Sequence, residues 1–238
     1  MTTQQTAPSP RRQLKIGHRV TTMHLALPAS PAEAGVARAG VIVVHPWWGL
    51  NDDVIAFADR LAEAGFAAAA PDLFAGQVAT TIPEAEGLSD SVDEDIADAF
   101  VLAVVDELGA TVGDPAARLG AVGFSFGAAW ALWLPAQRPE VAATVVYYGS
   151  TEGPSLSRAR TPVLGHFAES DPYETDDGLA AFEKTLRTAN REVEIHRYPA
   201  TGHWFAEPSK EAFVPDAAEL AFDRTVEFLR RHLLDDAD

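Results

Sequence analysis

Residues 123–127, Gly-Phe-Ser-Phe-Gly, are the segment of this chain whose residue types and spacing best suit nucleophilic catalysis. They follow an apolar run and precede a segment rich in alanine, tryptophan and leucine, as expected for a strand, a sharp turn and a helix. A G-x-S-x-G turn in this context can hold a serine hydroxyl, here that of Ser125, above the end of a parallel sheet. The pattern is short, and a glycine-rich turn between a strand and a helix can also be purely structural.

Two later segments supply an acid and a base, which gives the chain order serine, acid, histidine, one of the orders in which such triads occur. A predicted strand over residues 161–167 is followed by Asp171, and another over residues 192–198 is followed by His203. Because parallel strands place their carboxyl ends at one edge of the sheet, both side chains are expected near Ser125. A serine hydroxyl is a poor nucleophile, so we expect His203 to remove its proton and Asp171 to orient the imidazole.

Three other carboxylates compete for the role of the acid. Asp171 lies closer to the predicted strand end than Glu174 or Asp176, and its side chain is shorter and stiffer than that of Glu169. Asp171 followed by proline is also a common start of a turn, and a Gly-His pair can belong to a surface turn. The acid role is therefore predicted for Asp171, with these alternatives open.

The oxyanion of an acyl-transfer intermediate requires hydrogen-bond donors in fixed positions. One predicted donor is the main-chain N–H of Phe126, the residue after the serine. The second is expected from the turn after the β-branched run at residues 41–44, where Pro46 has no N–H and Trp47 is the favoured residue.

Aromatic side chains and two histidines stand in the loops expected around the serine. The aromatic residues could belong to the core, but we expect them to line the substrate pocket. They are Trp48, Phe74, Trp204 and Phe205. His45 and His166 each end a predicted strand, and the sequence leaves open whether they are structural or take part in the chemistry.

Strands alternate with helices along the chain, which predicts an α/β fold: a mainly parallel sheet with helices on both faces. The run at residues 41–44 is typical of a strand buried on both faces. An entry strand or hairpin is expected over residues 14–27, a loop over 29–38, and helices over 91–108, 177–189 and near the C-terminus. About a dozen residues, 149–160, separate two predicted strands, which leaves no room for a large lid.

The chain has 238 residues, for which we expect a disordered tail over residues 1–13 and a single domain over 14–238.

The amino-acid composition limits which partners and cofactors the protein can have. The formal net charge of −17 disfavours nucleic acid and anionic membranes. The absence of cysteine excludes disulfides, thiolate catalysis and cysteine-ligated metals.

The sequence also indicates where the protein is located and what it binds. No apolar run is long enough to span a bilayer, and the first twelve residues contain no signal-peptide core, so a cytoplasmic location is expected. We expect no metal and no other cofactor. The expected partner is a small-molecule ester or lactone, and the expected assembly is a monomer or a small homo-oligomer.

The chain resembles the dienelactone hydrolase family of α/β-hydrolases over about residues 14–235. The matching segments are VIVVHPWWGLN at 41–51, GFAAAAPDLF at 65–74, residues 120–127, VYYG at 146–149, Asp171, and GHWF at 202–205. The resemblance implies an α/β-hydrolase fold and hydrolysis of esters or lactones. It also implies the triad Ser125, Asp171 and His203 and the same two oxyanion donors.

The departures from the family bear on mechanism and substrate. The family's usual nucleophile is a cysteine where this chain has Ser125, and a glutamate that controls the thiol is replaced by Pro46. A substrate-binding arginine of the family is replaced by Glu207, which is expected to repel anions. No Lys or Arg stands between Arg60 and Arg118. We therefore expect neutral or hydrophobic small esters or lactones rather than anionic dienelactones.

Other functions remain open. A true dienelactone hydrolase could bind its substrate carboxylate through Arg158, Arg160 or another remote base. The same triad could serve a peptidase or an acyltransferase, and the fold could be a catalytically silent scaffold. A nucleotide-binding protein is disfavoured, because the glycines at 120, 123 and 127 do not have G-x-G-x-x-G spacing.

Overall fold

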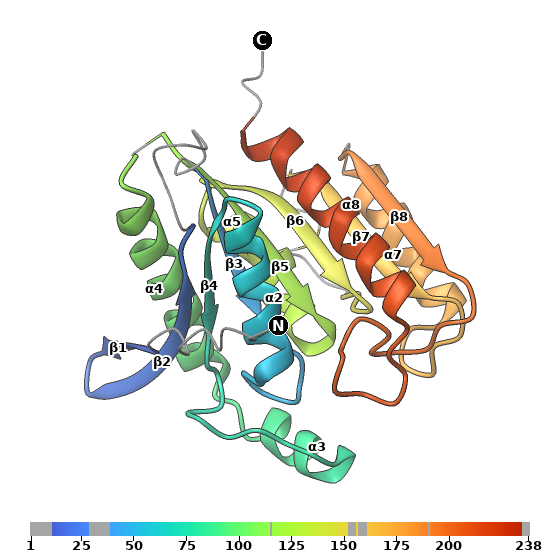
Figure 1. Ribbon diagram of the computed structural model, residues 1–238, viewed down its shortest axis with the longest axis horizontal. Helices are drawn as coiled ribbons and strands as arrows, with labels where there is room; N and C mark the ends of the chain where they lie inside the picture. The colour runs from blue at the N-terminus through green and yellow to red at the C-terminus, as the bar shows by residue number, and fades with distance from the viewer. Residues whose placement is uncertain are drawn as a thin grey trace, which may run out of the picture.

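Eight strands form one sheet with helices on both of its faces (Figure 1). The computed structural model describes residues 11–28, 39–114, 116–151, 156, 161–189 and 191–234. The strands are β1 (Arg12–Ile16), β2 (Arg19–Ala26), β3 (Ala39–Val44), β4 (Ala67–Pro71), β5 (Arg118–Phe124), β6 (Val141–Tyr147), β7 (Val163–Ala168) and β8 (Val193–Tyr198). The helices are α2 (Asp52–Glu63), α3 (Ile82–Asp90), α4 (Glu94–Val112), α5 (Ala128–Gln137), α7 (Asp176–Thr188) and α8 (Pro215–Leu233), with a 3₁₀ turn η1 (Ser125–Gly127).

The sheet is parallel except at one edge. Its strand order is β1-β2-β4-β3-β5-β6-β7-β8, and only the β1–β2 and β2–β4 pairs are antiparallel. All pairs from β4 to β8 are parallel, so these strands place their carboxyl ends at the same edge of the sheet. The predicted mainly parallel sheet with helices on both faces is confirmed.

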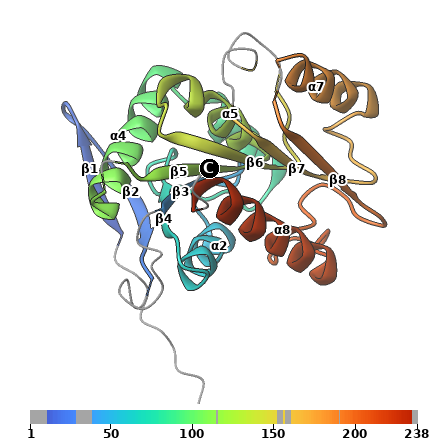
Figure 2. The same ribbon diagram turned by 90° about the horizontal axis from the view of Figure 1, so that it is seen from above.

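Strand β3 shows why a continuous apolar run was required. Val41 and Val43 point to the face covered by α2 and α8, whereas Ile42 and Val44 point to the face covered by α4 and α5. Successive side chains of a strand alternate between faces, so a strand covered on both sides needs apolar residues throughout. The view along the sheet shows the two layers of helices, with α7 on the same side as α4 and α5 (Figure 2).

The helix over residues 82–90 was not predicted from the sequence. A capping box between Thr81 and Glu84 starts α3, but its only fully buried side chain is that of Ala85. A second helix, α4, begins at Glu94 behind the N-cap Asp93 rather than at residue 91. The helix expected over 91–108 is therefore confirmed as α4, which the N-cap at Asp93 starts a few residues later than expected and which continues to Val112.

The N-terminal segment departs from expectation over a few residues. Strand β1 begins at Arg12, inside the expected tail, because it forms a hairpin with β2. Residues 1–10 and the expected loop at 29–38 lie outside the described residues. Among the residues that the structure describes, none of the helices has both the length and the apolar character of a membrane span.

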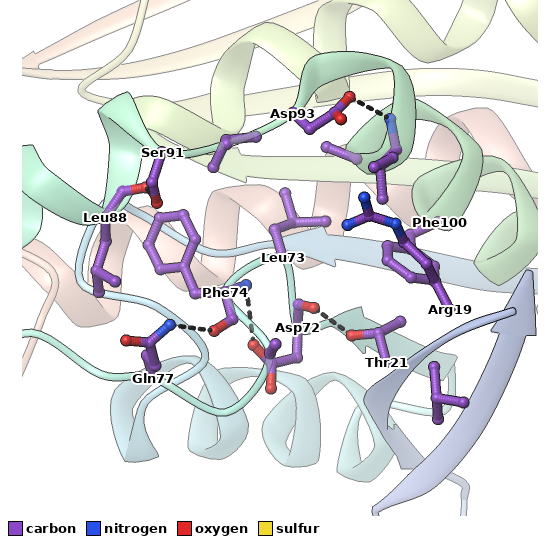
Figure 3. Close-up of a pocket in the computed structure, with 15 residues that line it drawn as sticks. Arg19, Thr21, Asp72, Leu73, Phe74, Gln77, Leu88, Ser91, Asp93 and Phe100 are labelled. Carbon is purple, nitrogen blue, oxygen red and sulfur yellow. Dashed lines mark hydrogen bonds between the residues drawn. The ribbon is translucent and has the colours of Figure 1, made fainter.

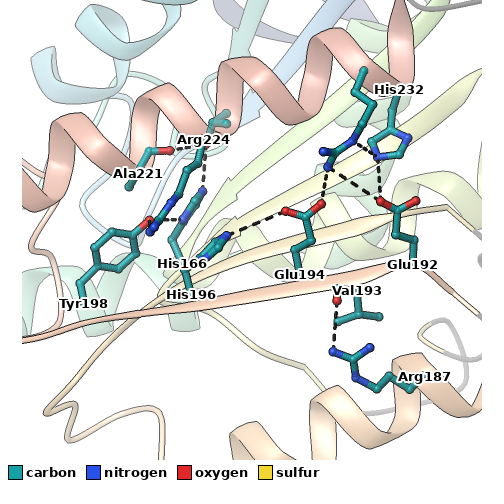
Figure 4. Close-up of polar contacts among 12 residues, drawn as sticks. His166, Arg187, Glu192, Val193, Glu194, His196, Tyr198, Ala221, Arg224 and His232 are labelled. Atoms are coloured by element: carbon teal, nitrogen blue, oxygen red, sulfur yellow. Dashed lines mark hydrogen bonds and ion pairs between the residues drawn. The ribbon is translucent and has the colours of Figure 1, made fainter.

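A buried polar network joins the sheet to α8 (Figure 4). His166 on β7 has no exposed surface; its Nδ1 lies 2.8 Å from the Tyr198 hydroxyl and its Nε2 lies 3.0 Å from the Thr225 hydroxyl. The Thr225 hydroxyl donates to the Ala221 carbonyl oxygen at 2.9 Å, so it must accept from Nε2–H. The Tyr198 hydroxyl, which accepts from Arg224 at 3.2 Å, then donates to Nδ1. These partners hold His166 as the neutral Nε2–H tautomer.

This environment makes folding sensitive to acid. Burial holds the pKa of His166 well below its ordinary value, and the positive charges of His196 and Arg224 act in the same direction. Because the unfolded chain binds the proton more tightly, stability is present above the unfolded pKa, about 6.5, and falls as the pH drops below it.

Between pH 7.5 and pH 5, we expect His166 to lower the urea midpoint of the native chain relative to that of a variant without the imidazole. The variant His166→Met should be less stable at pH 7.5 but should lose less stability over the same range, since it has no imidazole to protonate. The measurement is urea denaturation followed by circular dichroism at several pH values. An equal loss in both proteins would show that His166 is not the source of the acid sensitivity.

Candidate active site

Strand β5 ends in a turn that main-chain contacts make sharp. Ser125 has a φ of +47°, a conformation that non-glycine residues seldom adopt. A Cβ on Gly123 would lie 2.5 Å from the carbonyl oxygen of Gly127, and a Cβ on Gly127 would lie 2.4 Å from that of Val44. Both positions therefore require glycine. The predicted succession of strand, turn and helix is confirmed, with α5 starting at Ala128.

The structure brings together the three residues predicted as nucleophile, base and acid. The Ser125 hydroxyl lies 3.0 Å from His203 Nε2, and His203 Nδ1 lies 2.7 Å from Asp171 Oδ2. The other carboxylate oxygen of Asp171 accepts the main-chain N–H groups of Tyr173 at 2.9 Å and Glu174 at 3.2 Å. The side chains of His203 and Asp171 are 4 % and 2 % exposed, so the pair is shielded from bulk water.

The loops that follow β7 and β8 are fastened to each other beyond the sheet. The Glu169 N–H donates to the Tyr198 carbonyl oxygen at 3.1 Å, and the Ser170 N–H donates to that of Thr201 at 3.1 Å. The strand pairing thus continues into both loops. Asp171 and His203 follow directly in these two loops, and their side chains meet for that reason.

The competing acids are held elsewhere. A carboxylate oxygen of Glu169 accepts the N–H of Ala200 at 2.8 Å. Glu174 accepts both the N–H and the hydroxyl of Ser150, at 2.9 and 2.6 Å. Asp176 forms an ion pair near the surface with an arginine of β8. None of these three contacts is with an imidazole.

The two predicted oxyanion donors lie in different environments. The Pro46 carbonyl oxygen accepts from the Gly49 N–H at 3.1 Å and from His45 Nδ1 at 2.7 Å. No cis peptide occurs in the described chain, so the Trp47 N–H, in the same peptide group, points the opposite way. The N–H of Phe126 belongs to the first turn of the helical segment after β5, where N–H groups lack partners within the helix.

Aromatic rings surround the imidazole of His203. Its centroid lies 5.0 Å from that of Tyr148, 4.8 Å from that of Tyr173 and 5.1 Å from that of Trp204. Trp204 is partly exposed, as a pocket residue should be, and Tyr173 is 47 % exposed. Tyr173 was not predicted; the only signal in the sequence was its position two residues after Asp171.

The other expected pocket residues are more deeply buried. Trp48 is 3 % exposed and Phe74 is 4 % exposed. Phe205 has no exposed surface, and its ring packs 5.5 Å from Tyr148 and 4.9 Å from Tyr198 in the core. The expectation that Phe205 lines the substrate pocket is therefore wrong, because the turn at His203–Trp204 directs this ring inward.

Phe74 borders a separate cavity of about 350 Å³ between β2, α3 and α4 (Figure 3). Neither Ser125 nor His203 is among its lining residues, which include Arg19, Asp93 and Phe100. The cavity lies behind the wall that Phe74 shares with His45 and Phe126, whose ring centroids are 4.8 and 5.6 Å from its own.

Glu207 differs from its expected role. Its side chain is buried, with one oxygen accepting the Tyr148 hydroxyl at 2.9 Å. Burial raises the pKa of this carboxyl to about 8, although the Tyr148 hydroxyl and the Lys210 ammonium both oppose the shift. The group is therefore neutral near pH 7, and the expectation that it repels anionic substrates is wrong at that pH. The Lys210 ammonium lies 3.3 Å from the centroid of the Trp48 ring.

Known proteins are similar to this chain over most of its length. The model of the dienelactone hydrolase family matches residues 25–233. A protein of Bradyrhizobium sp named as a 2-oxo-3-(5-oxofuran-2-ylidene)propanoate lactonase is 32 % identical over 225 residues, which cover 88 % of this chain and 90 % of that protein. A protein of Aquifex aeolicus named as a carboxymethylenebutenolidase is 28 % identical, covering 86 % of this chain and 92 % of its own length.

A solved structure shows the same fold. The crystal structure of a dienelactone hydrolase from Klebsiella pneumoniae superposes with a TM-score of 0.79 at 24 % sequence identity. The alignment covers 94 % of this chain and 98 % of that one. The α/β-hydrolase fold predicted from the sequence is confirmed.

We expect Glu207→Gln to stabilise the protein increasingly as the pH rises from about 4.5 to about 8. The raised pKa means that the folded state keeps a proton that the unfolded state loses over this window, so stability is present below pH 4.5 and is lost toward pH 8. The gain of the variant should grow by at most about 1.4 kcal/mol per pH unit. Urea denaturation at pH 5, 6.5 and 8 measures it, and Glu211→Gln on the same loop is the matched control. A gain that does not grow with pH would contradict a neutral Glu207.

Proposed function

This chain belongs to the dienelactone hydrolase family of carboxylic-ester hydrolases, and we propose that it works through a serine acyl-enzyme formed on Ser125. Its proposed substrates are small esters or lactones without a negative charge. The observation that carries the proposal is the pair of contacts joining the Ser125 hydroxyl to His203 at 3.0 Å and His203 to Asp171 at 2.7 Å.

In the proposed reaction, the same three groups act in both the acylation and the deacylation step. His203 Nε2 accepts the hydroxyl proton while the Ser125 oxygen attacks the carbonyl carbon, and the proton then passes to the leaving alcohol. Asp171, bonded to Nδ1, favours the required tautomer and stabilises the imidazolium. Water, deprotonated by the same imidazole, releases the acid and restores the serine.

The negative oxygen of each tetrahedral intermediate would lie between the N–H groups of Trp47 and Phe126. These donors belong to the main chain, so they need no rearrangement as charge develops on the substrate. The partly exposed ring of Trp204 and the exposed ring of Tyr173, both beside His203, would provide an apolar wall for the ester.

Charge argues for uncharged substrates. From residue 61 to residue 117 the chain contains twelve acidic residues and no basic one, and this segment includes the loop after β4 and helix α3. An anionic acyl group would meet this negative potential, and the segment contains no arginine for the bidentate contact that binds carboxylates most strongly.

A carboxylated lactone is the second candidate substrate. The name of the Bradyrhizobium relative specifies a propanoate-bearing lactone. Glu207 is neutral near pH 7, and the Lys210 ammonium on Trp48 is a cation close to the aromatic wall. Arg158 and Arg160, the remote bases considered for this role, lie outside the described residues.

We expect Ser125→Ala to lose esterase turnover by about ten thousand-fold or more while the protein keeps its fold, since triad members act as one unit. A sulfonyl fluoride should label Ser125 in the native chain, as mass spectrometry of peptides would show. The matched control is Ser89→Ala at a partly exposed serine of α3, which should retain native turnover. Substantial turnover by the Ser125→Ala variant would exclude the proposed mechanism.

We expect a neutral lactone methyl ester to have a kcat/KM about tenfold above that of the matched free carboxylate, a ratio equivalent to about 1.4 kcal/mol. Steady-state kinetics on the two compounds measures it. The reverse preference would favour the second candidate. In that case Lys210→Met should lower turnover of the carboxylate selectively, since it removes the cation but keeps the apolar stem.

A further inference from the structure

His45 is a fully buried histidine at the carboxyl end of β3, and no step of the proposed reaction uses it. Both ring nitrogens have main-chain partners. Nδ1 lies 2.7 Å from the Pro46 carbonyl oxygen, and Nε2 lies 3.1 Å from the Leu73 nitrogen. A carbonyl oxygen can only accept and an amide N–H can only donate, so the ring is the neutral Nδ1–H tautomer.

The neutral state is enforced by the surroundings. A second ring proton, on Nε2, would face the Leu73 N–H, and two donors cannot bond to each other. Burial lowers the pKa of His45, which outweighs the opposing effects of the Pro46 carbonyl and of Asp72. The imidazole therefore has a fixed orientation and a fixed proton.

The hydrogen bond from Nδ1 acts on the peptide group that contains the Trp47 N–H. The Pro46 oxygen accepts both this bond and the Gly49 N–H. Two bonds on the carbonyl side fix the plane of the peptide, and they also polarise it, which makes the N–H on the other side a stronger donor. The direction and the strength of the Trp47 N–H thus both depend on the imidazole.

The same ring contacts the residue that supplies the other donor. The rings of His45 and Phe126 are stacked, with centroids 6.3 Å apart and an angle of 16° between the planes. The main chain of His45 is itself pressed against the turn after β5, since a Cβ on Gly127 would lie 2.6 Å from the His45 carbonyl oxygen. One residue therefore lies against both of the proposed oxyanion donors.

We propose that His45 is a positioning residue of the oxyanion hole, which orients and polarises the Pro46–Trp47 peptide so that the Trp47 N–H meets the developing oxyanion. This inference rests on the proposed serine mechanism. His45 does not touch the substrate and exchanges no proton during the reaction. Its effect falls on the transition state, because the Trp47 N–H bonds more strongly to an oxyanion than to a carbonyl oxygen.

Two variants separate the two hydrogen bonds of the ring. In His45→Asn, the side-chain amide nitrogen can occupy the place of Nδ1 and donate to Pro46. In His45→Gln, the amide reaches the place of Nε2, where its oxygen can accept from Leu73, but it leaves the Pro46 bond unmade. Both variants replace the imidazole ring with a smaller amide. If His45 had only a structural role, both substitutions would therefore change kcat to a similar extent.

We expect His45→Gln to lose about ten- to a hundred-fold in kcat with little change in KM, somewhat less than the loss of an entire oxyanion donor. His45→Asn should keep kcat within about fivefold of the native value, because it restores the bond to the peptide that matters. The control is His24→Gln, which removes another buried histidine, one that bonds to Asp59 on α2 and not to the site. This control should lower the melting temperature without lowering kcat.

A pair of inhibitors reports on the oxyanion itself. A trifluoromethyl ketone adds to Ser125 and forms a tetrahedral oxyanion, whereas the matched methyl ketone binds without that addition. His45→Gln should weaken binding of the trifluoromethyl ketone in proportion to the loss in kcat and leave binding of the methyl ketone unchanged. Equal kcat values in the Asn and Gln variants, or equal weakening of both ketones, would overturn the proposal.

The native chain provides a test that does not depend on the folding of a variant. Nitrogen-15 spectra of the histidine rings should show His45 protonated on Nδ1 and bare on Nε2. The Nδ1 proton resonance should move downfield when the trifluoromethyl ketone adduct forms, because the Pro46 oxygen gains negative charge as the Trp47 N–H bonds to the oxyanion. A resonance that does not move would overturn the proposal. The proposed function is tested separately, by comparing the turnover of the native chain with that of Ser125→Ala.

Discussion

One close main-chain contact, between the turn after β5 and the end of β3, holds Ser125 and the proposed oxyanion donors in place. Gly127 lies so near the Val44 and His45 carbonyl oxygens that no side chain fits between the two segments. Protein interiors resist such overlap strongly, so the turn has little freedom to relax. The strained φ of Ser125 and the position of the loop at Pro46 follow from this single approach. Ser125 and the two proposed oxyanion donors are therefore placed by backbone packing rather than by flexible side chains.

The proposed base and acid follow β8 and β7, the two strands at one edge of the sheet. The parallel pairing of β7 with β8 sets their register, and the hydrogen bonds beyond the strands carry that register into the loops of Asp171 and His203. The imidazole is then enclosed by the rings of Tyr148, Tyr173 and Trp204, which limit its rotation. The segments after the central strands β3 and β5 and the loops after the edge strands β7 and β8 thus converge on Ser125.

Much of this arrangement could be predicted from the sequence, because it depends on local patterns. The alternation of strands and helices gave a parallel sheet, the run at 41–44 predicted a strand buried on both faces, and the order of Ser125, Asp171 and His203 suggested the convergence seen in the structure. Helix α3 was missed because it buries only Ala85 and so lacks an apolar stripe.

The errors concern properties that arise only in three dimensions. Whether Phe205 faces substrate or core is decided by the turn before it. Whether Glu207 is charged is decided by how completely neighbouring groups exclude water from it. The role proposed for His45 was equally inaccessible from the sequence, since it depends on which side of one peptide group the ring contacts.

The aromatic wall has an optical consequence. Three of the five tryptophans, Trp47, Trp48 and Trp204, lie with ring centroids 5.3 to 6.1 Å apart. Indoles at such separations couple their electronic transitions, which gives a strong near-ultraviolet circular dichroism signal from this one place. Trp204 also touches the ring of His203, so its fluorescence senses the imidazole directly. The protein thus contains a spectroscopic probe at its candidate active site, and ligand occupancy can be followed there without an added label.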